Sequence, residues 1–359
     1  MTLLDLEDLD HIALGATVLG TGGGGDPTLG KLMAQQAVRR HGPIRLVSLD
    51  EVADEAWLIP TAMMGAPTVL VEKIPSGTEV LDAFRMVEHH LHSRAFATLS
   101  IEAGGVNSMI PMLVAASLGI PIIDADGMGR AFPEIQMVTP SLHGVAATPM
   151  AIGDEKGNRV LLETVDNFWT ERLARTATVS LGCSTAVALY PMQARVAKKA
   201  LLRGTLSLAQ RIGQTLHATT ARQSHDPIEA LLDLLGGRRL GQGKITDVRR
   251  QTQQGFARGE LDIRGTGPDA GVTFRLAFQN ENLLFWREDQ PQATVPDLIT
   301  VVDEQSGRPV TTESLQYGLR VAVLGFPSHA QWQTPAGLAL VGPRAFGYEI
   351  DYVPLHAST

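Results

Sequence analysis

Short apolar runs alternate with stretches of helical periodicity through the first third of the chain, and this alternation constrains the fold most. The stretches of helical periodicity lie at residues 78–92 and 107–118. The apolar runs lie at residues 44–49, 56–61, 95–101 and 121–124. Strands that alternate with helices form a parallel sheet with helices on both faces. The first part of the chain therefore predicts an α/β fold.

From about residue 145 the pattern changes. Residues 239–290 alternate apolar and polar side chains around glycine turns, which is typical of an antiparallel sheet. Residues 176–189 form a β-prone run, and helical periodicity returns at residues 191–202, 207–218 and 227–235.

Because 359 residues are more than one core usually holds, we predict two domains. The first is an α/β domain over residues 1–165 that carries a glycine-rich loop and an acidic loop. The second is an α+β domain with a largely antiparallel sheet over residues 166–359. Its last strands either stay in the second domain or return to the first.

The composition excludes several classes of protein. With 44% hydrophobic and 19% charged residues, the chain folds around a core and is not disordered. Thirty Lys and Arg against 38 Asp and Glu give a net charge of −8. No basic run is present to neutralise a row of phosphates, so we expect no nucleic-acid partner.

Three features bear on location. The single cysteine, Cys183, excludes an intramolecular disulfide and favours a reducing compartment. The N-terminus is acidic where a secretory or mitochondrial leader is basic. The uncharged stretch 103–123 is long enough to cross a bilayer, but it contains Pro111 and Pro121, so we interpret it as a buried helix and a buried strand. We expect a cytoplasmic protein with no membrane partner.

A run of glycines at residues 20–25 fits the dinucleotide-binding pattern Gly-x-Gly-x-x-Gly. It follows a helix predicted over residues 3–19, whereas that pattern requires a strand, so we expect no NAD or ATP. The run is either a crossing of two helices, backbone to backbone, or a rim that binds an anion or a carbonyl group. The entropy cost of four consecutive glycines favours the rim. Its residues are Thr21, Gly22, Gly23, Gly24 and Gly25.

Glu102 and Asn107 follow the predicted strand 95–101. Ligands bind at the carboxyl ends of the strands in an open parallel sheet. Glu102 is therefore a candidate general base or metal ligand. Asn107 either orients a ligand or simply caps the helix that follows.

An acidic loop over residues 124–134 follows the next strand and holds Asp124, Asp126, Arg130 and Glu134. Carboxyl groups this close raise one another's pKa or share a cation. The alternative is a solvated loop in which Arg130 pairs with one of the acids. Because strand ends meet at one edge of a sheet, we expect the acidic loop to share one cleft with the two preceding segments.

Four motifs, taken in order, resemble the S-methyl-thiohydantoin desulfurase-domain family. They lie at residues 19–27, 102–107, 124–134 and 342–348. The resemblance implies a bacterial cytoplasmic enzyme that acts on a five-membered thiohydantoin ring. Such an enzyme replaces the S-methyl group by the oxygen of water and leaves a hydantoin and methanethiol. The alternative is a non-catalytic accessory subunit, because family members resemble partners encoded beside hydantoinase-type and oxoprolinase-type enzymes.

This reaction needs a base for the water and an acid for the departing sulfur. We predict that Asp124 or Asp126 activates the water and that Glu134 is either the complementary acid or a metal ligand. Arg130 and Asn107 are expected to hold ring oxygens or a substrate carboxylate. The glycine rim would donate backbone N–H groups to the ring.

A bound divalent cation, zinc or manganese, is the favoured alternative to a shared proton among these acids. Its expected ligands are Glu102, Asp124, Asp126 and His143. The expected partner is a small cyclic amide or thiohydantoin. A homo-oligomer and a hydantoinase-type protein partner both stay open.

Overall fold

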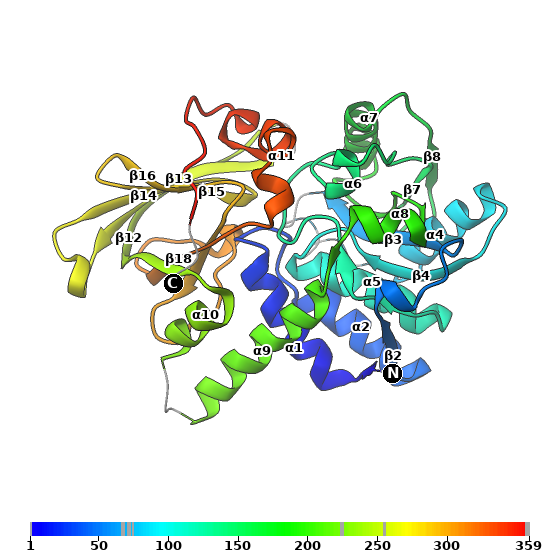
Figure 1. Cartoon of the computed structure of the whole chain (residues 1–359), viewed down its shortest axis with the longest axis horizontal. Helices are drawn as coiled ribbons and strands as arrows, with labels where there is room; N and C mark the ends of the chain where they lie inside the picture. Colours follow the sequence, from blue (N-terminus) through cyan, green and yellow to red (C-terminus); the bar gives the residue numbers. More distant parts are fainter. Residues whose placement is uncertain are drawn as a thin grey trace.

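The computed structural model describes residues 2–65, 69, 73, 75–222, 226–253 and 256–355. Its two large sheets lie side by side, with the first sheet and most helices on one side and the second sheet on the other (Figure 1). The predicted class, an α/β domain joined to a largely antiparallel α+β domain, is confirmed.

The first sheet is mixed, and its strands follow the order β1-β2-β5-β4-β3-β9-β7-β8, with β10 also paired to β3. The central strands β2, β5, β4 and β3 are parallel, and the outer pairings are antiparallel. The strands are β1 (Thr2–Leu4), β2 (Ile44–Val47), β3 (Trp57–Gly65), β4 (Ala95–Ser100), β5 (Ile122–Ile123), β7 (Met150–Gly153), β8 (Arg159–Leu162), β9 (Ser184–Ala188) and β10 (Met192–Gln193).

Helices cover both faces of this sheet because side chains alternate along its strands. Val187 belongs to the apolar core on one face, whereas Ala186 and Ala188 belong to the core on the other. The helices that contribute to the core containing Ala186 and Ala188 are α1 (Leu6–Leu19), α2 (Thr28–His41), α4 (Glu79–His90), α5 (Gly105–Leu118), α9 (Thr205–Arg222) and α10 (Pro227–Leu235). The helices that contribute to the core containing Val187 include α7 (Asn167–Ser180) and α8 (Ala194–Ala200).

The second sheet is antiparallel throughout, in the order β16-β15-β14-β13-β12-β18-β17. This confirms the antiparallel sheet predicted over residues 239–290. Its strands are β12 (Arg238–Gln253), β13 (Phe256–Gly265), β14 (Thr273–Gln279), β15 (Glu281–Arg287), β16 (Gln290–Thr294), β17 (Leu298–Asp303) and β18 (Arg320–Phe326). A separate two-stranded pair joins β6 (Ala125–Asp126) to β11 (Leu202–Arg203).

The β-prone run at residues 176–189 is only partly a strand. Residues 176–180 close helix α7, and β9 begins at Ser184. Asp166 caps α7 by accepting a hydrogen bond from the backbone N–H of Trp169 at 2.8 Å. Thr176 donates its hydroxyl to the carbonyl of Arg172 at 2.8 Å. Cap and packing together override the β propensity of the threonines.

Residues on both sides of position 165 build the first sheet, since β9 and β10 pair with β3. The last strands, β17 and β18, stay in the second sheet. It is the segment after them that packs back on the first domain: Trp332 donates its indole N–H to the carbonyl of Met128 at 2.8 Å and meets the ring of Phe132 edge-on.

Residues 103–123 form α5 and β5, as the sequence predicts. None of the helices described is both long and apolar enough to cross a membrane.

Candidate active site

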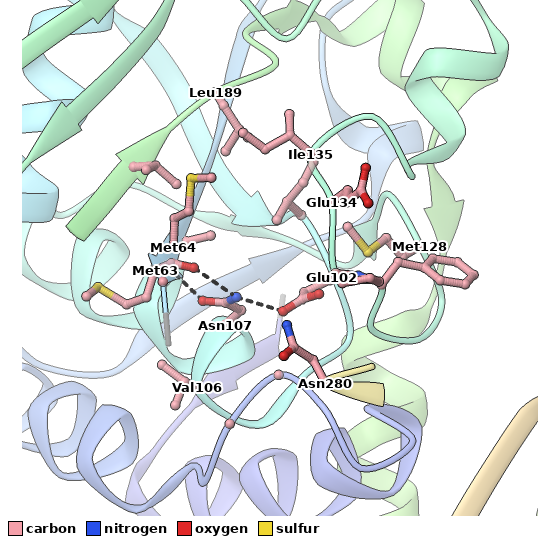
Figure 2. A pocket seen from close by; sticks show the side chains of 18 of the residues that line it. Met63, Met64, Glu102, Val106, Asn107, Met128, Glu134, Ile135, Leu189 and Asn280 are labelled. Atoms are coloured by element: carbon pink, nitrogen blue, oxygen red, sulfur yellow. Dashed lines mark hydrogen bonds between the residues drawn. The ribbon is translucent and has the colours of Figure 1, made fainter. Parts of the chain in front are cut away.

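A cavity of about 120 Å³ lies beyond the carboxyl ends of β3 and β4, next to the first turn of α5 (Figure 2). The second domain closes it with the turn between β14 and β15, which supplies Asn280 and Glu281. The other lining residues that concern the chemistry are Gly24, Gly25, Met63, Met64, Glu102, Asn107, Met128, Glu134, Ile135, Arg175 and Leu189. The cavity therefore needs both domains.

Asn107 fixes the position of Glu102. The side-chain Oδ1 of Asn107 accepts the backbone N–H of Met63 at 2.7 Å, which fixes the orientation of the amide. Its Nδ2 donates to Oε1 of Glu102 at 2.7 Å and to the carbonyl of Met63 at 3.2 Å. Figure 2 shows the resulting chain from Met63 through Asn107 to Glu102. The carboxyl group is thereby tied to strand β3 as well as to its own strand end.

Burial shapes the acidity of Glu102, which is 5% exposed. Loss of water raises its pKa to about 7, although hydrogen bonds from Asn107 and from the backbone of Phe132 favour the ionised form. At neutral pH both protonation states are therefore well populated. A carboxyl group in that condition can take up or give a proton.

Glu281 enters the same cavity from the second domain and is 3% exposed. Its Oε1 packs against Gly23, which has no side chain. A Cβ atom on Gly23 would lie 2.1 Å from this Oε1. Its Oε2 is buried and has no hydrogen-bond partner among the residues described. Burial, with the charge of Glu102 added, raises the pKa of Glu281 well above its ordinary value. Burial therefore favours the neutral form of Glu281, although the charge of Arg130 acts in the opposite direction.

Glu134 lies on the wall across the cavity from Asn107 (Figure 2). Its carboxylate accepts a short hydrogen bond from the side chain of Gln136. Burial and the neighbouring Glu171 raise the pKa of Glu134, and the charges of Arg175 and Arg258 oppose that rise.

The remaining walls are apolar. Met63 and Met64 come from β3, and Ile135 and Leu189 close the cavity on another side (Figure 2). Two glycines, Gly24 and Gly25, form part of the rim, and their backbone N–H groups donate to no acceptor within the described residues. The space suits a small, flat molecule with a few polar atoms.

The structure brings five of the predicted site residues to this cavity: Gly24, Gly25, Glu102, Asn107 and Glu134. Three of the expected segments therefore share one cleft. The remaining predicted residues lie outside its lining.

Asp124 caps helix α9. Its Oδ1 accepts the backbone N–H groups of Leu206 and Ser207, each at 3.0 Å, and its Oδ2 accepts the hydroxyl of Ser207. The helix N-terminus thus occupies the carboxylate. Asp124 is not placed to activate water in the cavity.

Asp126 and His143 also lie apart from the cavity lining. Oδ1 of Asp126 accepts the backbone N–H groups of Met128 at 3.1 Å and Gly129 at 2.8 Å, and burial raises the pKa of Asp126 to about 8. The ring of His143 is exposed, with Nε2 3.1 Å from Oε1 of Gln331.

The four expected metal ligands therefore do not converge. In the part of the chain that the structure describes, no group of three or more His, Cys, Asp or Glu side chains is placed to hold a metal ion. The residues present do not fit the predicted zinc or manganese site.

Arg130 is fully buried and joins the two domains rather than facing a ligand. Its Nη1 donates to the carbonyls of Pro296 at 2.9 Å and Asp297 at 2.7 Å. Its Nη2 donates to the hydroxyl of Thr21 at 2.8 Å and to the carbonyl of Asn282 at 3.3 Å. With Nε bound to the carbonyl of Ala131, the guanidinium has no donor left for a substrate.

The glycine run connects the two domains and also forms part of the cavity rim. Thr21 and Gly22 accept backbone hydrogen bonds from Asn282 and Thr312 of the second domain, each at 2.8 Å. The carbonyl of Gly24 accepts the N–H of Val106, in the first turn of α5, at 2.9 Å. Thr21, Gly22 and Gly23 therefore face protein, and only the end of the run borders the cavity.

Sequence reasoning missed Glu281 and Asn280. A signal was present, because the polar residues 279–282 interrupt two apolar stretches that end at Phe278 and begin at Leu283. A turn in an exposed hairpin gives the same pattern, so only the closure of the second domain on the first separates the two cases.

The fold and the site define a two-domain α/β protein with a buried acidic cavity where the domains meet. The chain belongs to the S-Me-THD-like family: the family model for the N-terminal domain matches residues 7–164, and the model for the C-terminal domain matches residues 165–355. The family resemblance of the four sequence motifs is confirmed.

A protein of Chromobacterium violaceum, known from an X-ray crystal structure, has the same fold. It superposes with a TM-score of 0.81 at 25% sequence identity, and the match covers 99% of this chain and 100% of that one. No curated protein matches the chain.

Proposed function

We propose that this protein is a hydrolase that replaces the S-methyl group of a five-membered thiohydantoin ring by the oxygen of water. The family name supports the ring chemistry. The observation that carries the proposal is Glu102: a buried carboxyl group with a pKa near 7, held by Asn107 in an apolar cavity at the sheet edge where ligands bind.

In the first step, the Glu102 carboxylate takes a proton from water while the water oxygen bonds to the ring carbon that carries sulfur. The electron pair of the C=N bond moves to the ring nitrogen, which then takes the proton from Glu102. The result is a neutral tetrahedral intermediate. The free N–H groups of Gly24 and Gly25 supply donors for a ring oxygen.

In the second step, Glu102 takes the proton of the new hydroxyl group, the C=O bond forms and the C–S bond breaks. The departing sulfur takes a proton from Glu281, whose neutral form burial favours. The products are a hydantoin and methanethiol, and a proton returned from Glu102 to Glu281 restores the enzyme.

A second candidate function is that of an accessory subunit for a hydantoinase-type partner. Helix α7 exposes Phe168, Trp169, Leu173 and Val179, and Val165, two residues before the helix, is exposed as well. Apolar side chains gathered on one face are typical of a protein contact. This role predicts no turnover by the chain alone and turnover only with the partner.

The test is release of methanethiol from an S-methyl thiohydantoin by the purified chain, followed with a thiol reagent. We expect turnover by the wild type, loss of at least a hundredfold in Glu102→Gln, and no loss in Glu55→Gln, which alters an exposed carboxyl group far from the cavity lining. Absence of turnover by the wild-type chain alone would refute the proposal, and turnover only after a hydantoinase is added would favour the accessory role.

A further inference from the structure

A second cavity lies in the C-terminal domain, outside the site described above. It has a volume of about 380 Å³ and opens on β12, β13 and β14 next to the C-terminal segment. The residues that line it and bear on a ligand are Arg249, Arg250, Arg258, Glu260, Phe278, Phe346 and Tyr348. Its lining includes Gly259, where a Cβ atom would lie 2.6 Å from the ring of Phe278.

Positive charge predominates in this cavity. The charge of Arg249 is balanced by Asp247 and by Asp262, whose Oδ2 lies 2.7 Å from Nη1. The single acid of the lining, Glu260, lies 3.7 Å from Arg249 and 4.0 Å from Arg275. Neither of the other two arginines, Arg250 and Arg258, forms an ion pair with a carboxylate among the residues that the structure describes.

Arg250 is engaged by neutral groups. Its guanidinium donates to the backbone carbonyls of Thr312, Glu313 and Leu315. These bonds hold the side chain in place without cancelling its charge. Arg250 therefore contributes a fixed positive field to the cavity.

Arg258 is the unusual member. Its Nε is buried and lacks a hydrogen-bond partner, and its guanidinium forms no ion pair with any side chain that the structure describes. A buried donor without an acceptor destabilises a fold, so native proteins normally satisfy such groups with protein, water or ligand. The planar fork of a guanidinium matches the two oxygens of a carboxylate or phosphate.

The other walls are aromatic. Phe278 comes from β14, and Phe346 and Tyr348 come from the C-terminal segment. Aromatic side chains bind flat apolar groups through their faces and edges. Phe278 and Phe346 are almost fully buried and Tyr348 lies against Trp286, so the parts of these rings that border the cavity form a fixed apolar wall.

We propose that this cavity binds a small molecule that carries an oxyanion, carboxylate or phosphate, on a flat apolar ring, with the oxyanion on Arg258 and the ring among Phe278, Phe346 and Tyr348. This site does not depend on the proposed hydrolase activity. The two cavities share no lining residue, although the charge of Arg258 also acts on Glu134 of the first cavity and opposes the rise of its pKa.

Titration calorimetry with benzoate, phenyl phosphate and inorganic phosphate tests the proposal on the full chain. Benzoate and phenyl phosphate distinguish a carboxylate from a phosphate, and inorganic phosphate shows what the ring adds. We expect at least one ring-bearing anion to bind, and to bind more tightly than inorganic phosphate. Affinity should fall tenfold or more in Arg258→Ala and less in Arg258→Lys, which keeps the charge but loses the fork.

Two control variants localise the binding. Arg264→Ala removes an exposed arginine from the same strand, β13, and should leave the affinity unchanged. Glu102→Gln alters the first cavity and should also leave it unchanged. The proposal is overturned by absence of binding of all three anions, by equal losses in Arg258→Ala and Arg264→Ala, or by binding lost only in Glu102→Gln.

Discussion

Glu102 and Asp124 are both carboxyl groups at the carboxyl ends of neighbouring parallel strands, and their surroundings give them different roles. Asp124 meets the N-terminus of α9, which supplies hydrogen bonds that stabilise a carboxylate. Glu102 is enclosed by apolar side chains and has one side-chain donor, Asn107. Burial therefore determines its chemistry.

Asn107→Ala removes a hydrogen bond that favours the ionised form of Glu102. The pKa of Glu102 should rise above its present value of about 7, so the acidic limb of kcat/KM should move to higher pH by about half a unit or more. Profiles of kcat/KM against pH for the wild type and the variant measure this shift. An unchanged midpoint with a lower plateau would show that Asn107 only holds strand β3.

Glu102→Gln should stabilise the folded chain at high pH. The folded state raises the pKa of Glu102 from 4.5 to about 7, so the wild type loses stability as the pH rises through that window, whereas glutamine cannot ionise. One pKa unit corresponds to about 1.4 kcal/mol, so the gain at pH 8 is up to about 3 kcal/mol.

Urea unfolding of the wild type and Glu102→Gln at pH 5 and pH 8 measures this difference, with Glu55→Gln as the exposed control. A stability difference that does not grow with pH would contradict the raised pKa.

At the scale of the element, helices and strands follow from the sequence wherever periodicity and packing agree. Helix α5 and strand β4 are examples, since their apolar patterns match their buried faces. Residues 176–180 are different, because a cap ten or more residues earlier determines their state. The role of Asp124 was also hidden, because the helix that it caps begins some eighty residues later.

Asp124→Ala should destabilise the chain by about 1 kcal/mol, the usual effect of losing a helix cap, and leave turnover per folded molecule unchanged. Asp124→Asn keeps an acceptor and should lose less. Thermal unfolding and activity normalised to the folded fraction are the measurements. A large loss of turnover with normal stability would return Asp124 to the active site.

Gly24 and Gly144 are a matched pair of positions for testing the close contact between the glycine run and the segment that begins α5. Both have φ near +70°, but a Cβ on Gly24 would lie 2.5 Å from the Cα of Gly104, whereas Gly144 has open space around it. Alanine at either position strains the backbone alike, so the difference in unfolding free energy reports the contact. We expect Gly24→Ala to cost about 1–3 kcal/mol more than Gly144→Ala. Equal losses would show that this crossing is loose.

At the scale of the whole molecule, the cavity exists because the second domain docks on the first. Arg130 and the glycine run make this junction, and it brings Glu281 beside Glu102. The sequence shows the half of the site that lies at strand ends, because that placement follows from parallel-sheet topology. It cannot show the half contributed by a hairpin of the other domain.

The most direct test of the proposed hydrolysis is to follow the water oxygen into the product. The purified chain is incubated with an S-methyl thiohydantoin in water enriched in oxygen-18, and the hydantoin is examined by mass spectrometry. We expect one labelled oxygen in the product together with methanethiol from the wild type, and neither from Glu102→Gln. A product without label, or equal labelling by Glu102→Gln, would contradict it.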